Sequence, residues 1–251
     1  MKYLLPIAVF SVSLITLSFA TNKQTKPLAN DENGFALVEL FTSEGCSSCP
    51  AADVIVEEVQ KEYGHKNVLI LGYHVDYWDR LGWKDVYSNA VFTKRQEYYA
   101  GIFRLNSIYT PQIVVNGKAE FVGSNKSRLT GNIDEQLNEK PVATIKLKAL
   151  QNTSGKIDVN YSTEGADAAK EQAVLTLIQK KATSEIKRGE NKGRTLHHIN
   201  IVRYVFYMPL KESATSFTLP DGFDKSDFFI AGFIQEKRTG KIKALQSIVI
   251  Q

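Results

Sequence analysis

Both cysteines of this chain lie in one short stretch, GCSSCP, which covers residues 45–50. The apolar run FALVELF (35–41) precedes them and is typical of a buried strand. Residues 50–64 follow with apolar side chains at helical spacing, and a second apolar run, NVLILGYHV (67–75), comes next. The order strand, cysteine loop, helix, strand predicts a βαβ unit whose two strands are parallel.

The segments after this unit complete an α/β domain. Residues 76–109 are rich in aromatic side chains and are predicted to be helical. Residues 110–123 indicate a strand, a turn and a strand, because Asn116-Gly117 is a strong hairpin signal. Residues 124–139 indicate a closing helix.

The pattern of apolar and turn residues changes after residue 140. Short strand-like segments, seven of them, alternate with turn residues as far as the C-terminus. This spacing favours an antiparallel all-β sandwich of the immunoglobulin-like kind. We therefore expect an α/β domain over 35–140, which carries the CxxC motif, and a β-sandwich domain over 141–251.

The first residues predict export. Residues 1–20 carry one charge, Lys2, and then an apolar run that ends in small residues, as in a signal peptide cut after Ala20. Residues 21–34 are polar and are expected to be flexible. We expect a secreted or periplasmic protein with no stable membrane anchor, since no later segment is long and apolar enough to span a bilayer.

Charge and motifs exclude several function classes. The chain has 31 Lys and Arg against 27 Asp and Glu, so its formal net charge of +4 gives little reason to expect nucleic-acid binding. It has neither a Gly-rich phosphate loop nor a serine nucleophile elbow. Nucleotide binding and serine hydrolysis therefore lack support.

The CxxC motif is open to three interpretations: a redox pair, a metal clamp or a structural staple. A helix that begins at about Cys46 would stabilise a thiolate there and bring Cys49 beside it. Ser47 and Ser48 can cap this helix or donate hydrogen bonds to sulfur, whereas Glu44 would raise the thiol pKa. A loop this short removes little entropy from the unfolded chain, which weakens the staple.

A polar group follows the second strand. His74 and Asp76, with Asp79 close by, come just beyond the strand end, where active groups gather in parallel sheets. His74 could tune Cys46 or accept a proton, and with the two thiols it could bind zinc or copper. The alternative is a structural polar cluster.

A second polar group, RGENKGRTLHHINIVR (188–203), lies in the predicted sandwich. One interpretation is an exposed turn followed by an ordinary strand. The other is a loop docked over Cys46, in which Arg194 favours the thiolate. His197 and His198 point to opposite faces of a strand, so only one of them can face inward or towards the first domain.

Residues 35–140 resemble a thioredoxin-like domain, because YTPQIVVNG matches the segment in which a cis-proline begins the strand beside the active-site helix. The mature chain also resembles a family of exported bacterial proteins classed as a thioredoxin-like domain of unknown function. The stretches that carry this likeness are VELFTSEGCSSCPAAD, YHVDYWDRLGWKD, RQEYY, YTPQIVVNG and GENKGRTLHHINIVR.

The resemblance implies roles for individual residues. Cys46 is the attacking thiol and Cys49 the resolving thiol of a Cys46–Cys49 disulfide. Pro111 is the cis-proline, and Thr110 offers backbone atoms to the partner peptide. The long aromatic-rich segment implies an inserted pair of helices. The family brings no established substrate.

The first functional hypothesis is an exported thiol–disulfide oxidoreductase that acts on protein or peptide thiols and exchanges electrons with a partner protein. No separate cofactor and no metal are expected, because the cysteine pair is the redox group. One alternative is a non-enzymatic binding module with a structural disulfide. Another is copper or zinc handling by Cys46, Cys49 and His74.

Overall fold

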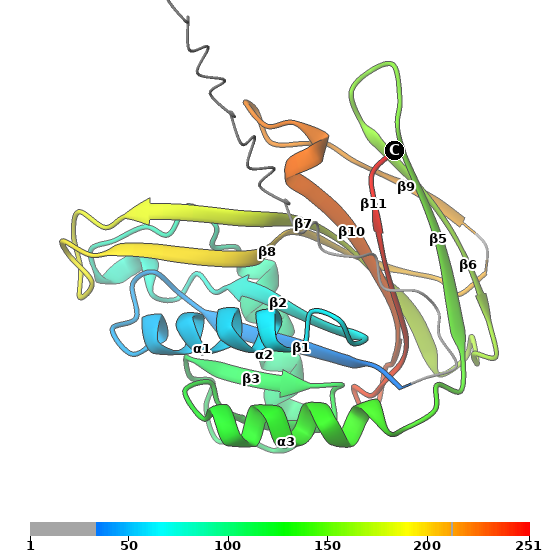
Figure 1. The fold of residues 1–251 in the computed structure, drawn as a ribbon, viewed down its shortest axis with the longest axis horizontal. Coiled ribbons are helices and arrows are strands. Elements are labelled where there is room, and N and C mark those ends of the chain that lie inside the picture. The colour runs from blue at the N-terminus through cyan, green and yellow to red at the C-terminus, as the bar shows by residue number, and fades with distance from the viewer. Residues whose placement is uncertain (1–33, 212) are drawn as a thin grey trace, which may run out of the picture.

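The protein is built around one eight-stranded mixed sheet (Figure 1), as seen in a computed structural model that describes residues 34–211 and 213–251. The strand order is β11-β10-β7-β8-β2-β1-β3-β4. A second sheet has the order β5-β6-β9. The predicted signal peptide, and the predicted flexible segment up to residue 33, lie outside the described residues.

The chain up to residue 140 supplies one half of the large sheet and the helices beside it. The predicted parallel pairing is confirmed, because β1 runs parallel to β2, while β3 pairs antiparallel with both β1 and β4. The elements are β1 (Ala36–Thr42), α1 (Cys49–Glu62), β2 (Val68–His74), α2 (Ala90–Phe103), β3 (Gln112–Val115), β4 (Ala119–Val122) and α3 (Lys126–Leu137).

The expected pair of inserted helices is wrong. Residues 76–109 contain one long helix, α2, and before it only the short 3-10 helix η1 (Asp79–Leu81). The side chain of Asp79 accepts the backbone N–H of Asp85, and that of Asp85 accepts the N–H of Tyr87. Such local bonds compete with helical hydrogen bonding, so the segment turns instead of continuing as a helix.

The seven strands predicted after residue 140 are all present. They are β5 (Thr144–Gln151), β6 (Ile157–Glu164), β7 (Glu171–Glu185), β8 (Thr195–Met208), β9 (Ser213–Phe217), β10 (Phe228–Glu236) and β11 (Ile242–Val249), with the 3-10 helix η2 (Lys225–Asp227) before β10. Their pairings with one another are antiparallel. Four of them extend the large sheet, and three form the small one.

Strands from both sides of residue 140 meet where β8 lies parallel to β2, with Gly72 opposite Ile201. Asn200, whose φ is +49°, fixes this junction because its amide donates to the carbonyl oxygen of Ile70 at 2.9 Å. The β7–β8 hairpin therefore extends to the same end of the molecule as the loop that leads into α1 (Figure 1).

Alternating side chains of the large sheet face different cores. On β1, Leu37 and Phe41 join a core with residues of α2 and with strands of the C-terminal half. Ala36, Val38 and Leu40 instead pack against α1 and α3. The small sheet packs on β7, β10 and β11 through a third core. This period of two is the one expected of strands buried on both faces.

One buried cation ties α2 to the sheet. Arg95 is 1% exposed, and its Nε donates to Oε1 of Glu39 on β1 at 2.7 Å. Its other nitrogens donate to the hydroxyl oxygens of Tyr99 and Tyr207 and to the side-chain oxygen of Gln235, each at 3.2 Å. Arg95 therefore forms a buried ion pair and buried hydrogen bonds and does not lie on a solvated helix face.

Candidate functional site

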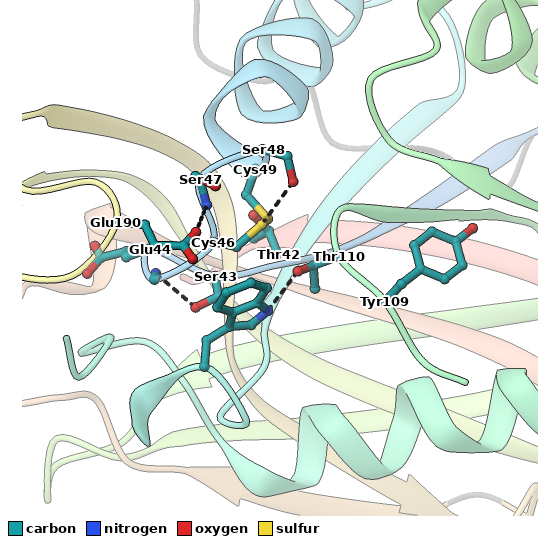
Figure 2. Close-up of a disulfide and its surroundings, with 12 residues drawn as sticks. Thr42, Ser43, Glu44, Cys46, Ser47, Ser48, Cys49, Tyr109, Thr110 and Glu190 are labelled. Carbon is teal, nitrogen blue, oxygen red and sulfur yellow. Dashed lines mark hydrogen bonds between the residues drawn. A yellow bond between two sulfur atoms is a disulfide. The ribbon is translucent and has the colours of Figure 1, made fainter. Parts of the chain in front are cut away.

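The two cysteines form a disulfide at the start of α1, with their Cα atoms 5.4 Å apart (Figure 2). The helix begins at Cys49, not at Cys46 as expected, because two successive turns come first: the N–H of Cys46 donates to Ser43 and that of Cys49 to Cys46. Ser48 is the N-cap residue, but its hydroxyl lies 3.4 Å from the sulfur of Cys46. The serines are exposed.

The disulfide itself is buried. Cys46 and Cys49 are each 0% exposed. The residues around Cys46 form hydrogen bonds with side chains that lie far away in the sequence. These include Trp83, Glu190 and Asn191. A thiol in solution therefore cannot reach either sulfur atom in this state of the protein.

The loop between β7 and β8, residues 186–194, covers the cysteine loop. The amide of Asn191 donates to the carbonyl oxygens of Glu44 at 2.8 Å and of Cys46 at 2.9 Å. The carboxylate of Glu190 accepts the backbone N–H of Ser47 at 3.1 Å (Figure 2). Features of both interpretations are present: the loop docks on the cysteine loop through Asn191 and Glu190, while most of its other residues are exposed and a strand follows it.

Two candidate site residues of this segment, Arg194 and His197, are not brought to the described cysteine loop. Arg194 is exposed, and no hydrogen bond or ion pair joins its side chain to the described cysteine loop. His197 is also exposed, with its Nδ1 3.1 Å from the hydroxyl of Thr183. Its neighbour His198 is the inward residue, at 4% exposure. The strand period gave opposite faces for the two histidines but not which face is inward.

A buried group of charges adjoins the cysteine loop through Glu44. His198 Nε2 is 3.3 Å from Oε1 of Glu44, and its Nδ1 is 3.5 Å from Oδ2 of Asp53. Asp53 lies one helical turn after Cys49 on α1. Burial lowers the pKa of His198, but the two carboxylates outweigh that effect and raise it to about 10. His198 is therefore an imidazolium near neutral pH.

Neither nitrogen of His198 has a hydrogen-bond partner among the described residues, although both lie at ion-pair distance from a carboxylate. A cavity of about 10 Å³ adjoins the ring, and Thr42, Asp53 and His74 also line it. A site of about this size and polarity accommodates one water molecule.

His74 belongs to the same buried region. Its Nδ1 is 2.6 Å from Oδ2 of Asp85, which also accepts the backbone N–H of Glu44 at 2.9 Å. Burial raises the pKa of Asp85, but His74 and the N–H donors outweigh it and hold that pKa below its ordinary value. The rings of His74 and His198 are 4.8 Å apart. His74 thus supports the cysteine loop through Asp85.

Asp76 lies outside this group. Its carboxylate accepts a hydrogen bond of 2.6 Å from the hydroxyl of Thr93 on α2. Glu44, in contrast, sits within the group, with its Oε2 accepting the indole N–H of Trp83 at 2.7 Å. Among the described residues, no group of three or more His, Cys, Asp or Glu side chains is arranged to hold a metal ion.

Thr110 lies on the other side of the disulfide from Glu190 in Figure 2, and Pro111 follows it in the chain. The peptide bond between them is cis, as predicted. The hydroxyl of Thr110 accepts the indole N–H of Trp78 at 2.8 Å. Pro111 is buried beside Gly123, where a Cβ would also meet Ala52 of α1, so this turn packs against the first turn of that helix.

Sequence reasoning missed Asp53, Asn191 and the inward position of His198. Asp53 has the i, i+4 spacing from Cys49 that places two side chains on one helix face, and this signal is visible in the sequence. The contacts of Asn191 join residues 145 and 147 positions apart, and no local pattern marks them.

Comparison with known proteins identifies relatives over most of the chain. Residues 37–235 match a family described as "Protein of unknown function (DUF1223)". No curated protein matches the chain. In the described part, no helix is long and apolar enough to cross a membrane.

Two solved structures share the fold. The crystal structure of protein AGR_C_4864 from Agrobacterium tumefaciens is 22% identical, covers 87% of this chain and 96% of its own, and superposes with a TM-score of 0.66. HBP35 of Porphyromonas gingivalis is 15% identical, covers 88% of this chain and 77% of its own, and has a TM-score of 0.55.

Proposed function

We propose that this chain, which belongs to the DUF1223 family of proteins of unknown function, is an exported thiol–disulfide oxidoreductase that acts on protein or peptide thiols. The observation that carries the proposal is the disulfide between Cys46 and Cys49, whose second cysteine is the first residue of α1. Unpaired backbone N–H groups at a helix N-terminus stabilise a thiolate. A pair at this position is suited to exchange.

The arrangement of the first half supports a thioredoxin-like assignment for residues 35–140. The cysteine loop joins two parallel strands through α1, and β3 runs antiparallel beside β1. Pro111 packs near the start of α1. The predicted signal peptide agrees with export, and exported proteins meet surroundings in which disulfides persist.

In the proposed exchange, a partner thiolate attacks the sulfur of Cys46. A new disulfide forms between the partner and Cys46, the Cys46–Cys49 bond breaks, and Cys49 leaves as a thiolate. A second partner thiolate then releases Cys46, so that the partner loses two electrons and the cysteine pair gains them. The reverse sequence oxidises the protein, with Cys49 resolving the mixed disulfide.

A trapping experiment tests this function. Cys49→Ser protein is mixed with a fluorescent peptide that carries one intramolecular disulfide. The expected result is a stable adduct on Cys46, whereas reduced wild-type protein releases the reduced peptide. Cys46→Ser is the matched control and should form far less adduct, because its remaining thiol is the resolving one. Equal labelling of the two variants would contradict the assignment of roles.

The buried state of the disulfide favours a second candidate, a binding module that keeps the pair as a structural link. A loop of this length adds only about 2 kcal/mol of stability in the chain-entropy description. If reduced wild-type protein turns over the peptide no faster than a free thiol does, and Cys46→Ser/Cys49→Ser protein keeps its fold, the binding module is the better description.

A further inference from the structure

The three hydrogen bonds that hold loop 186–194 over the cysteine loop come from two adjacent residues. Asn191 donates two of them, to the carbonyl oxygens of Glu44 and Cys46, and Glu190 accepts the third from Ser47. The side chain of Asn191 is 0% exposed, and its Oδ1 has no hydrogen-bond partner among the described residues. Among the described residues, the side chain of Asn191 therefore forms hydrogen bonds only with the cysteine loop.

The loop keeps its shape without these bonds. The N–H of Ile186 donates to Arg194, the N–H of Gly193 donates back to Ile186, and the N–H of Arg194 donates to Asn191. Gly189 and Gly193 flank the contact residues with φ of +73° and +83°, a region that glycine enters freely. The loop can thus leave the cysteine loop as one unit, at the cost of three hydrogen bonds, the burial of Asn191 and the packing of Gly189 beside Trp83.

Charge couples this docking to the redox state of the pair. The carboxylate of Glu190 lies beside Ser47, next to the N-terminus of α1. Reduction creates a thiolate at the same end of the helix, and two negative charges at short range repel each other. The docked loop therefore favours the oxidised pair. By reciprocity, the oxidised pair favours the docked loop.

We propose that residues 186–194 form a lid that determines which thiols reach Cys46, with Asn191 and Glu190 as its specificity-determining residues. The lid closes over the disulfide and is released when the pair is reduced. A reductant acts only when the lid has opened, so a partner that displaces Asn191 and Glu190 from the cysteine loop reacts ahead of one that does not. The selection of partners rests on the proposed exchange function.

Access is measured with dithiothreitol on the oxidised protein, by quenching aliquots with a maleimide reagent that adds mass to free thiols. Dithiothreitol loses two electrons and two protons and forms its own disulfide. The Cys46–Cys49 bond breaks, and the two cysteine sulfurs take up these electrons and protons. Asn191→Ala should be reduced about ten- to thirtyfold faster than wild-type protein, because it loses two of the three docking bonds. Glu190→Gln should be a few-fold faster.

Lys192→Ala is the matched control. Lys192 lies in the same loop, is exposed, and makes no side-chain hydrogen bond or ion pair with any residue that the structure describes. Its rate should stay within about twofold of the wild-type rate. An unchanged rate in Asn191→Ala would overturn the lid. A failure of dithiothreitol to reduce either the wild-type or the Asn191→Ala protein would overturn it too.

The coupling has its own readout. In a dithiothreitol redox buffer, Glu190→Gln and Asn191→Ala should favour the reduced pair up to about tenfold more than wild-type protein does, which is about 30 mV for two electrons. Equal equilibrium constants would refute redox coupling. Access to dithiothreitol does not require turnover, so a fast Asn191→Ala variant with no trapped peptide refutes the exchange function and leaves the lid standing. A trapped peptide with an unchanged Asn191→Ala rate does the reverse.

Discussion

Substitution of His198 by glutamine should remove a pH-dependent part of the stability. The pKa of His198 is about 10 in the folded protein, against 6.5 for an unperturbed histidine side chain. Because the folded pKa is the higher one, the imidazolium contributes stability that is fully present below about pH 6.5 and is lost as the pH rises through about 10. At about 1.36 kcal/mol per pH unit, the whole contribution is about 5 kcal/mol.

The window from about pH 8 to about pH 10 isolates this residue. Across the window, wild-type protein should lose about 2 kcal/mol more unfolding free energy than His198→Gln does.

Urea unfolding at several pH values, followed by tryptophan fluorescence, gives these free energies. His197→Gln is the control, since this neighbouring side chain is exposed. It should follow the wild-type curve. Parallel losses of stability in wild-type protein and His198→Gln would refute the assignment of a buried imidazolium.

Three further substitutions test the packing and the backbone conformation of the fold, each by urea unfolding. Arg95→Leu should cost about 3–5 kcal/mol, because it leaves the buried carboxylate of Glu39 without its cation, and adding Glu39→Gln should recover part of that loss. Gly117→Ala should destabilise, because φ is +62° there and a Cβ would meet the carbonyl oxygen of Gly240. Gly131→Ala should instead stabilise by about 0.4–1 kcal/mol, since it lies within α3 with nothing near its Cβ position. A loss in Gly131→Ala equal to that in Gly117→Ala would contradict the reasoning.

Local patterns in the sequence predicted most of the elements. The apolar runs before and after the cysteines specified β1 and β2, and Asn116-Gly117 specified the β3–β4 hairpin. The pattern failed in the segment before α2, where aromatic spacing suggested a helix while Asp79 and Asp85 hydrogen-bonded to backbone N–H groups instead. A binary pattern records which side chains are apolar, but not which polar ones bind the backbone.

The site itself was predictable only in part. Cys46 and Cys49 were evident from their spacing, and Thr110-Pro111 from its resemblance. The position of His198 depends on β8 lying beside β2, a junction at which Asn200 donates a hydrogen bond to Ile70. Nothing in the period of a strand says which distant strand will pair with it. The Gly-rich, charged composition of loop 186–194 is typical of an exposed turn, so its docking was one of two alternatives.

Part of the cover of the cysteine loop comes from late in the chain, and this sets an order of events. Asn191 follows Cys46 by 145 residues. At about 5–20 residues per second, a ribosome makes these residues in about 7–30 s. Throughout that interval the cysteines exist without the strand and loop that later enclose them. The oxidation state in which Cys46 and Cys49 are first buried is therefore set by the surroundings of the emerging chain. It is set before the folded protein can select which thiols react with the pair.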